Sequence, residues 1–540
     1  MGNFKSPQYT LPMKPKSLII TICFVVTVIA GLLLFNQNQQ AQPLQIQDNN
    51  ATSSVLITAS RDRVLFPAQC VFVTWQLEGI REAYLNSHGK IGQGAEESCT
   101  VGTPPTFRVI FQDGREVFYS LPVIQSYSTP LGFITLVLFI AGLSSLAGLL
   151  IGTRALLVVL VIAVFGSLLR AQVNLGQDYL DHDMFATIAL DNPRALPPHF
   201  LYHVSAIALY QSHLVPNIEN AGFVVMLVAQ IVTALSTYQL LQWLNRRRET
   251  LKPISGYMWV TAVLALMLLG PISLLEDNLR TGQANAFLFA NTYHNPTVNL
   301  LKPLAILLFW VILKLMQTLQ WRRLTGLAVA AATLTVLSTL AKPNYTIAIV
   351  PVVILVIAYS FLRPLRIPRL GMVVAVIIPA AVVLIWQFTF LYGAGHSSLV
   401  RGDNSSIIFA PFDYFVTINR IPFEWLLLDL LASILFPALI YVAYWRDTRH
   451  DITLNLSWLV FLITLAQAYF FNESPDGSHG NLTWGTQIGL FILFAVSVEY
   501  FVYKVGEAVR SHQHVNWSLI ASGIALSVHV VNRVAVLLTG

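Results

Sequence analysis

Charged residues are scarce in this sequence. They make up 11% of its 540 residues, whereas 55% are hydrophobic. Because a soluble domain carries about a quarter charged residues, this composition excludes an ordinary soluble protein. Apolar runs of about 17–23 residues recur along the whole chain, and each is long enough to cross a hydrocarbon core of about 30 Å as a helix. The sequence therefore predicts a polytopic α-helical membrane protein.

Positive charge is in small excess and lies in short clusters. The formal net charge is +6, and the basic residues stand between apolar runs. This distribution follows the positive-inside rule, by which Lys and Arg flank membrane spans on the cytoplasmic side. We therefore expect the lipid bilayer as a partner and no nucleic acid.

Cysteine is nearly absent, with 3 in the whole chain. Cys23 lies in an apolar run and predicts no chemistry. Cys70 and Cys99 share one polar segment. We expect a disulfide between them if that segment is exported to an oxidising compartment.

Residues 1–35 are predicted to be a cytoplasmic N-terminus and a transmembrane anchor. The polar start carries Lys5, Lys14 and Lys16, and an apolar run extends from Ser17 to Phe35. No clear small-residue cleavage site follows this run, which favours an uncleaved anchor over a signal peptide.

Residues 36–128 are predicted to form a small extracytoplasmic β-sandwich. Residues 36–52 are rich in Gln and Asn and are interpreted as a linker. The remainder alternates apolar and polar residues in short segments such as TFRVIF, separated by turns such as Asp113-Gly114. Cys70 opens the segment that contains Trp75, and in this respect the region resembles immunoglobulin-like modules. It has no cluster of acids, bases or metal ligands, so we expect a spacer or a binding module.

Residues 129–540 are predicted to form the multi-spanning domain. With the anchor, the apolar runs give about 13 transmembrane helices. No repeat of about 20–50 residues is visible. One side of the predicted topology holds the basic residues and the N-terminus, so that side is assigned to the cytoplasm and the loops 171–218, 276–300, 394–422 and 472–483 face outward. The runs are 130–152, 155–170, 219–243, 256–275, 301–318, 325–341, 345–362, 371–393, 423–444, 455–471, 484–503 and 517–538.

The first outer loop of this domain holds an acidic cluster in the segment QDYLDHD. Asp178 and His182 are four residues apart and would share a helix face, while Asp181 and Asp183 flank His182. Such a cluster beside a membrane costs solvation energy unless it is used or paired. It predicts either a solvated loop helix or a general base, with Asp181 and Asp183 as candidate ligands of a divalent cation such as Mg²⁺ or Mn²⁺. The following stretch, 197–211, is amphipathic and is predicted to be an interfacial helix.

Cations at the outer ends of the runs are candidate phosphate ligands. Lys302 stands just inside an apolar run, and Lys342 lies in a Lys-Pro-Asn-Tyr turn that breaks the positive-inside pattern. Arg280 lies in the second outer loop. Each would either bind an anionic group or extend toward the headgroups as an ordinary interfacial side chain.

Further polar residues in the outer loops are candidate substrate ligands. Trp484, next to them, is typical of the aromatic belt at the membrane interface. The candidates are Gln283, His294 and Asn295 in the second outer loop, and Glu473, His479 and Asn481 in the fourth.

Residues 130–540 resemble the GT-C class of integral-membrane glycosyltransferases. The resemblance lies in an acidic residue in the first large outer loop, here Asp178 or a neighbour, and in the segments GQANAFLF and AKPN. These segments are similar to the Gly-Gln-x-Asn and Lys-Pro elements of bacterial polyprenyl-linked mannosyltransferases, although YHNPT follows the first one here. The resemblance implies a bacterial plasma-membrane enzyme that moves a sugar from a polyprenyl-phosphate donor to a glycan, lipid or protein acceptor. It also implies that a carboxylate of the first outer loop, Asp178 or Asp183, is the base and that Lys302, Lys342 and Arg280 hold the donor phosphate.

Three other classes remain open on the sequence. A polysaccharide polymerase or ligase would also use lipid-linked glycans, with His294, His479 and Arg401 as candidates. A transporter would place ionisable residues near the bilayer midplane and show related halves, which are not visible here. A non-enzymatic envelope assembly protein would use the β-domain as its contact module.

Overall fold

The computed structural model divides the chain into two compact units, residues 1–175 and 176–540. The domain boundaries predicted at 35 and 128 stay a prediction. The structure describes residues 26–30, 33–34, 42–49, 53–64, 71–85, 88–90, 92–98, 106–125, 130–175, 177–193, 196–248, 254–272, 287–291, 293, 295–318, 320–362, 367–392, 406–474, 480–510 and 516–539.

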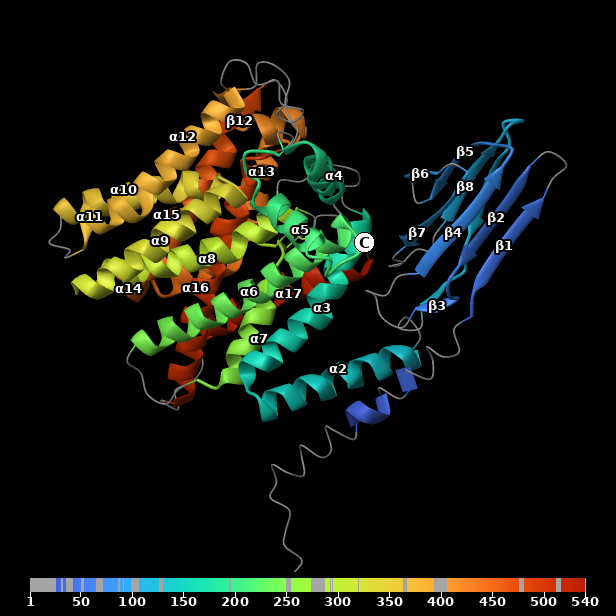
Figure 1. Cartoon of the computed structure of the whole chain (residues 1–540). Helices are drawn as coiled ribbons and strands as arrows, with labels where there is room; N and C mark the ends of the chain where they lie inside the picture. The colour runs from blue at the N-terminus through green and yellow to red at the C-terminus, as the bar shows by residue number, and fades with distance from the viewer. Residues whose placement is uncertain are drawn as a thin grey trace, which may run out of the picture. The chain divides into compact units, whose positions relative to one another are not determined.

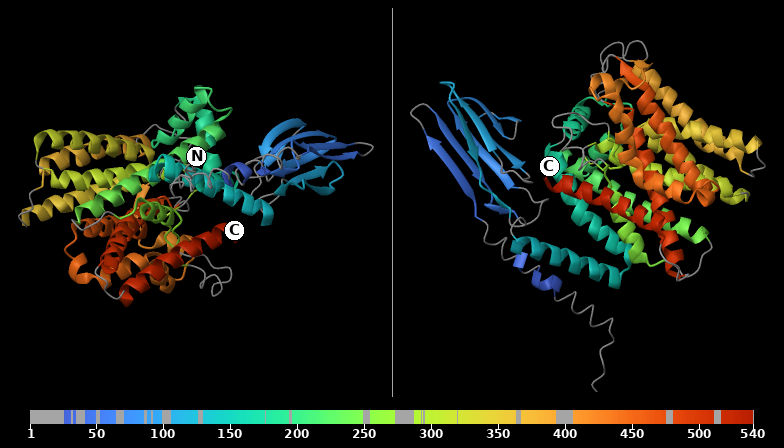
Figure 2. Two further views of the ribbon diagram at one scale, coloured as in Figure 1. Left: turned by 90° about the horizontal axis from the view of Figure 1, so that it is seen from below. Right: turned by 180° about the vertical axis from the view of Figure 1, so that it is seen from behind.

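The first unit contains the predicted β-sandwich (Figure 1, Figure 2). Its first sheet has the order β1-β2-β4-β7 and its second the order β6-β5-β8-β9, with antiparallel pairing throughout both. A short parallel pair joins β3 to β10. The strands are β1 Leu44–Asn49, β2 Ser54–Ala59, β3 Arg63–Val64, β4 Val71–Glu78, β5 Ile80–Leu85, β6 His88–Lys90, β7 Gln93–Ser98, β8 Thr106–Phe111, β9 Glu116–Ser120 and β10 Ile124–Gln125.

Alternate residues of the two sheets meet in one core. Along β4 every second side chain is buried, as a strand with one covered face requires. Trp75 of β4 packs against Phe107 of β8, with ring centroids 5.7 Å apart. At the edges, the hydroxyl of Tyr119 on β9 donates to a carboxylate oxygen of Asp48 on β1 at 2.5 Å. The sandwich is therefore held by a shared apolar core and by a polar contact between edge strands.

Strand β1 corrects the prediction that 36–52 is a linker. Leu44 and Ile46 are half-buried and pack against the sandwich core, while Gln45 and Gln47 are exposed. The polar composition of this segment hid its alternation, and pairing with β2 makes it an edge strand. Cys23, Cys70 and Cys99 lie outside the described residues, so the disulfide stays a prediction.

Helices α2 Pro130–Leu150 and α3 Thr153–Leu175 complete the first unit and pack against each other. Gly152 joins them with a φ of 125°, a backbone conformation that favours glycine. The second unit is helical apart from the hairpin of β11 Ser406–Phe409 and β12 Phe471–Ser474. Its helices are α4 Gln177–Asp191, α5 Leu201–Gln211, α6 Ile218–Arg247, α7 Gly256–Met267, α8 Pro296–Gln317, α9 Trp321–Ala341, α10 Asn344–Leu362, α11 Arg369–Met372, η3 Val373–Ile377, α12 Ile378–Tyr392, η4 Tyr414–Ile418, α13 Phe423–Ala443, α14 Trp445–Thr448, α15 Ile452–Phe470, α16 Thr483–Arg510 and α17 Trp517–Thr539.

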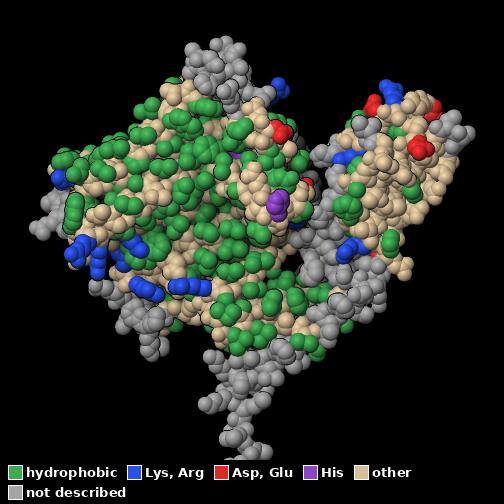
Figure 3. Space-filling view, viewed as in Figure 1, with side chains coloured by type: hydrophobic (Ala, Val, Ile, Leu, Met, Phe, Trp, Pro, Cys, Tyr) green, Lys and Arg blue, Asp and Glu red, His purple; other side chains and the backbone are tan. Residues whose placement is uncertain are grey.

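The protein is a polytopic helical membrane protein with a β-domain. Within the described residues, 10 helices are long and apolar enough to cross a membrane. Figure 3 shows that the visible flank of the helical unit is largely hydrophobic, while Lys and Arg gather at one end. Helix α16 is the central span, since 78% of its most apolar window is buried, and it packs against α6, α8, α10, α13, α15 and α17.

Helix α7 is shorter than the apolar run 256–275 that predicts it. It ends at Met267, and Gly270 and Pro271 follow outside any helix, because proline cannot continue a helix. Helix α17 fixes this segment. The backbone N–H of Gly270 donates to the His529 carbonyl at 3.2 Å, and the Asn532 side chain donates to the Pro271 carbonyl at 2.5 Å.

A buried ion cluster joins three helices at the basic end of the second unit, the end that carries Arg246, Arg322 and Arg323. Arg248, which follows α6, lies 2.8 Å from Asp451 at the start of α15. Its guanidinium also lies 3.0 Å from Glu499 on α16, whose side chain is 0% exposed. A buried carboxylate of this kind depends on its partner.

Replacing Arg248 with methionine is therefore expected to lower the free energy of unfolding by about 3–5 kcal/mol, because it strands the Glu499 carboxylate. Thermal unfolding of the purified chain measures the effect. Arg246→Met is the matched control, since Arg246 is exposed nearby on α6. Equal melting temperatures for the two variants would contradict this role of Arg248.

Candidate functional site

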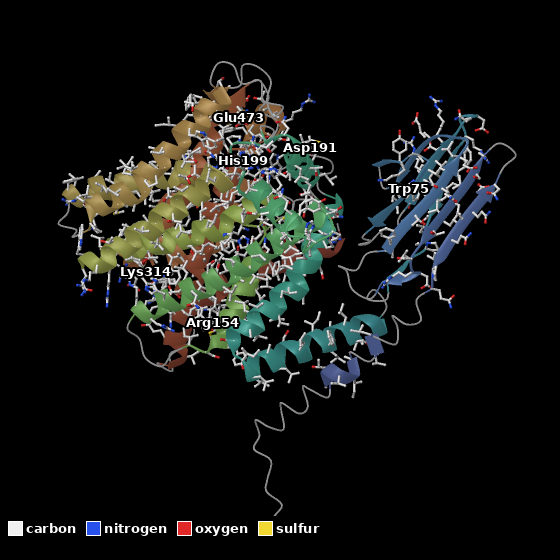
Figure 4. The ribbon with its side chains drawn as sticks, in the orientation of Figure 1. Trp75, Arg154, Asp191, His199, Lys314 and Glu473 are labelled. Carbon is white, nitrogen blue, oxygen red and sulfur yellow. The ribbon has the colours of Figure 1, made fainter. Side chains whose placement is uncertain are left out.

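Polar residues of the loops that are predicted to face outward converge at the other end of the second unit. Figure 4 shows Glu473 and His199 near each other at this end and Lys314 at the basic end. Helices α4 and α5, the start of α8, the α9–α10 junction and the hairpin before α16 supply the side chains. We call this group the loop-end site, and it contains most of the described residues that the sequence singles out.

Helix α4 positions Asp178 and His182 as their spacing predicts. Both lie on one continuous helix, with Asp178 in its first turn, where a carboxylate is favoured by the helix dipole. The Asn295 amide donates to a carboxylate oxygen of Asp178 at 3.1 Å. Since Asn295 is the N-cap of α8, this bond ties α4 to the start of a membrane span.

Lys342 is the buried cation of the site. It caps the C-terminus of α9, and its ammonium donates to the Thr297 hydroxyl at 3.2 Å. The indole ring of Trp484 lies 5.4 Å away. Burial lowers the pKa of Lys342 to about 8, while the charges of Asp178 and Glu473 act in the opposite direction. Two carboxylates therefore face this ammonium.

A continuous chain of hydrogen bonds connects Lys342 to Asp178. Lys342 donates to Thr297, whose hydroxyl donates to the side-chain oxygen of Asn295 at 2.8 Å. Asn295 in turn donates to Asp178. Along this Lys342–Asp178 chain every N–H or O–H group donates and every oxygen accepts as its chemistry allows. Hydrogen bonds in series polarise one another. The arrangement fixes a cation and a carboxylate at a set separation.

Glu473 and Asn481 are candidate substrate ligands from the same loop, and their side chains contact each other. The Asn481 amide donates to a Glu473 carboxylate oxygen at 2.8 Å. Asn344, the first residue of α10, donates to the Asn481 carbonyl at 2.6 Å. The loop after α15 is thus bonded to the turn that contains Lys342.

A histidine pair lies beside Lys342. Nδ1 of His182 and Nε2 of His203 are 3.0 Å apart, so one nitrogen donates and the other accepts. Burial lowers the pKa of His203 to about 4. Burial also lowers the pKa of His182 well below its ordinary value, with smaller effects of His203, Lys342 and His199 in the same direction. Both rings are therefore neutral at pH 7 and suited to hydrogen bonding.

Asp183 has a different environment from Asp178. It is buried, and the Tyr202 hydroxyl donates to one of its oxygens at 2.8 Å. Burial raises the pKa of Asp183 to about 8, against the effect of the Tyr202 hydrogen bond. Asp183 is therefore largely protonated at neutral pH, which makes it a weaker base candidate than Asp178.

Asp181 and Asp183 have different surroundings on α4. Residues two apart on a helix face opposite sides, and here Asp181 is exposed while Asp183 is buried. Within the described part of the chain, no group of three or more His, Cys, Asp or Glu side chains could hold a metal ion. The candidate role of Asp181 and Asp183 as ligands of Mg²⁺ or Mn²⁺ stays a prediction.

Lys302 lies about 7.5 Å deeper along α8 than Thr297, at 1.5 Å per residue. Its ammonium donates to the Ala290 carbonyl at 3.2 Å and to the Asn291 side chain at 2.9 Å. Asn291 donates to the Leu266 carbonyl at 2.8 Å. Lys302 thus anchors the segment before α8 to the end of α7, and its predicted contact with phosphate stays a prediction.

Other candidates fall outside the described residues, and their roles stay predictions. They are Arg280, Gln283, His294, Arg401 and His479.

Sequence reasoning missed several residues of the site. His199 and His203 are four apart, the spacing that identified Asp178 and His182. Asn295-Pro296-Thr297 is an N-cap followed by proline at the first helical position, a signal of a helix start. That signal lies in YHNPT, the departure from the GT-C pattern.

Comparison with family models, curated proteins and solved structures gives no match to this chain. The site is therefore interpreted by its own chemistry.

Gly222 of α6 lets the Asp183–Tyr202 pair approach the helix. A Cβ there would lie 2.9 Å from the Asp183 carboxylate and would collide with the Tyr202 hydroxyl. Gly222→Ala is expected to lower the free energy of unfolding by about 1–3 kcal/mol through overpacking. Thermal unfolding measures it, with Gly326→Ala in α9 as the control, since no atom lies within 4 Å of a Cβ at that helical glycine. The control should leave the free energy of unfolding unchanged or raise it by up to about 1 kcal/mol. Equal shifts in melting temperature for the two variants would refute the close approach of the Asp183–Tyr202 pair to α6.

Proposed function

We propose that this protein is a GT-C-type membrane glycosyltransferase that moves a sugar from a polyprenyl-phosphate donor to an acceptor hydroxyl. The observation that supports the proposal is the Lys342–Asp178 chain, in which a buried cation and a carboxylate belong to one hydrogen-bonded site. The sequence resemblance to GT-C enzymes supports it. We further propose a bacterial plasma membrane, with the loop end outside the cell.

The position of Lys342 suits a lipid-borne phosphate. It stands between the ends of the spans α9 and α10, where the headgroups of a bilayer begin. A phosphate there would gain a charge-assisted hydrogen bond from the ammonium, which is stronger in a buried site than in water. The Trp484 ring beside it is suited to contact the carrier or the sugar.

The proposed reaction is a displacement at the anomeric carbon. The acceptor oxygen forms a bond to that carbon, and its proton passes to the Asp178 carboxylate. The bond from the anomeric carbon to the phosphate oxygen breaks, and the electron pair stays on the departing polyprenyl phosphate. The Lys342 ammonium stabilises the negative charge that develops there.

Neutral side chains around this pair are suited to hold sugar hydroxyls. The His182–His203 pair offers imidazole donors and acceptors, and Asn481 offers an amide beside Glu473. A transporter is less well supported, because its ionisable residues lie near the bilayer midplane. In this chain Lys342 and Glu473 lie at the ends of spans, and Asp178 is bonded to Asn295 at the start of another.

Asp178→Asn is expected to reduce sugar transfer about 10²–10⁴-fold, because the amide cannot accept the proton. The assay follows sugar transfer from a polyprenyl-phosphate donor by the reconstituted chain. Asp191→Asn is the matched control, since Asp191 is exposed at the other end of α4. Unchanged transfer by a folded Asp178→Asn variant would remove Asp178 from the reaction.

Donor affinity should depend on pH through Lys342. Its pKa of about 8 means that the ammonium is lost as pH rises through that value, so the KM for the donor should rise above about pH 8. In Lys342→Arg the charge persists, and the rise should move to higher pH. Lys342→Ala should raise the donor KM and abolish this pH dependence. An alkaline limb that is the same in all three proteins would contradict phosphate binding by Lys342.

A further inference from the structure

The basic end of the second unit contains a pocket that the transfer proposal does not use. Its volume is about 530 Å³, and it opens where α6 and α8 end and α9 begins. Figure 4 labels Lys314 at this basic end of the unit. The pocket is lined by Trp243, Lys314, Gln317, Thr318, Arg323 and Gly326, with Leu327 beside them.

The pocket is cationic. Lys314 and Arg323 line it, and no residue of its lining is acidic. Within the described part of the chain, neither Lys314 nor Arg323 has a carboxylate within ion-pair distance, in contrast to Arg248 and Lys504 at the same end. A third cation, Arg247, lies over the Trp243 ring at 4.9 Å. The charges of Lys314 and Arg323, which have no carboxylate at ion-pair distance among the described residues, favour an anionic ligand.

Aromatic and apolar groups border the same pocket. The Lys314 ammonium lies 3.8 Å from the Trp310 ring centroid and 6.0 Å from that of Trp243, an arrangement typical of the membrane interface. Along α9, Val329 is 62% exposed one turn beyond Gly326, on the apolar surface of the span. A ligand with an anionic head and an apolar tail would match both parts.

We propose that this pocket binds the phosphate headgroup of an anionic membrane phospholipid. The phosphate would contact Lys314 and Arg323, the polar headgroup would reach Gln317 and Thr318, and the acyl chains would follow α9 past Val329. A free phosphate ion would use the cations but not the apolar path. The inference is independent of the proposed transfer reaction, since none of these residues belongs to the loop-end site.

Native mass spectrometry of the full chain in detergent, with phosphatidylglycerol or phosphatidylcholine added, tests the proposal. The wild-type protein should retain phosphatidylglycerol in preference to phosphatidylcholine. Each surface cation contributes about 5-fold to the binding of an anionic lipid, so Lys314→Gln with Arg323→Gln should reduce retention about 30-fold. Arg446→Gln with Arg449→Gln is the control, because it removes the same charge from exposed positions outside the pocket.

A second variant separates the shape of the pocket from its charge. Gly326→Leu keeps both cations, and a Cβ at Gly326 meets no atom within 4 Å, so the added side chain would occupy the pocket without strain. It should also lose phosphatidylglycerol. Equal retention by wild type and both pocket variants, or equal retention of phosphatidylcholine, would overturn the proposal. Displacement of the lipid by millimolar inorganic phosphate would show a general anion site and would overturn the assignment to a lipid.

Discussion

The loop-end site depends on how the Lys342 ammonium is compensated. A buried cation at the end of a membrane span is costly unless polar groups surround it, and here those groups come from elements far apart in the sequence. Thr297 accepts its hydrogen bond, Asp178 and Glu473 supply opposite charge, and Trp484 lies beside it. Helix α4, the start of α8, the α9–α10 turn and the loop before α16 must therefore meet at this point. The same constraint gives the site its proposed chemistry, because a cation held next to a carboxylate can bind a phosphate while the carboxylate accepts a proton.

Charged side chains have different partners at the two ends of the helical unit. At the basic end, Arg248 is saturated by Asp451 and Glu499 and serves to join α6, α15 and α16. At the loop end, Lys342 has one bonded hydroxyl and two carboxylates that act on it without a direct ion pair among the described contacts. A saturated charge stabilises the fold, whereas an incompletely paired one leaves capacity for a ligand. This difference separates the structural cluster from the candidate site more clearly than residue type does.

Much of the fold could be predicted from the sequence, because apolar runs and strand alternation are local signals. The apolar run 256–275 predicts a longer helix than α7, which ends before Gly270 and Pro271. The polar residues of β1 conceal a period of two, so composition alone predicts a linker there. Two features of the candidate site can be predicted from the sequence. One is the helical spacing of Asp178 and His182, and the other is the position of Lys342, which breaks the positive-inside pattern. The bond from Asn295 to Asp178 spans 117 residues, and the Tyr202–Asp183 contact depends on a glycine in a third helix, so neither leaves a local pattern. The distinct environments of Asp178 and Asp183 likewise arise only from packing.

The most direct test of the central claim is a structure of the chain with a non-hydrolysable polyprenyl-phosphate sugar bound. We expect the phosphorus atom within about 4–5 Å of the Lys342 ammonium, the range of a phosphate oxygen in ion-pair contact, with the anomeric carbon toward Asp178. A phosphate bound elsewhere in the helical unit, with the Lys342–Asp178 chain facing no ligand, would contradict it.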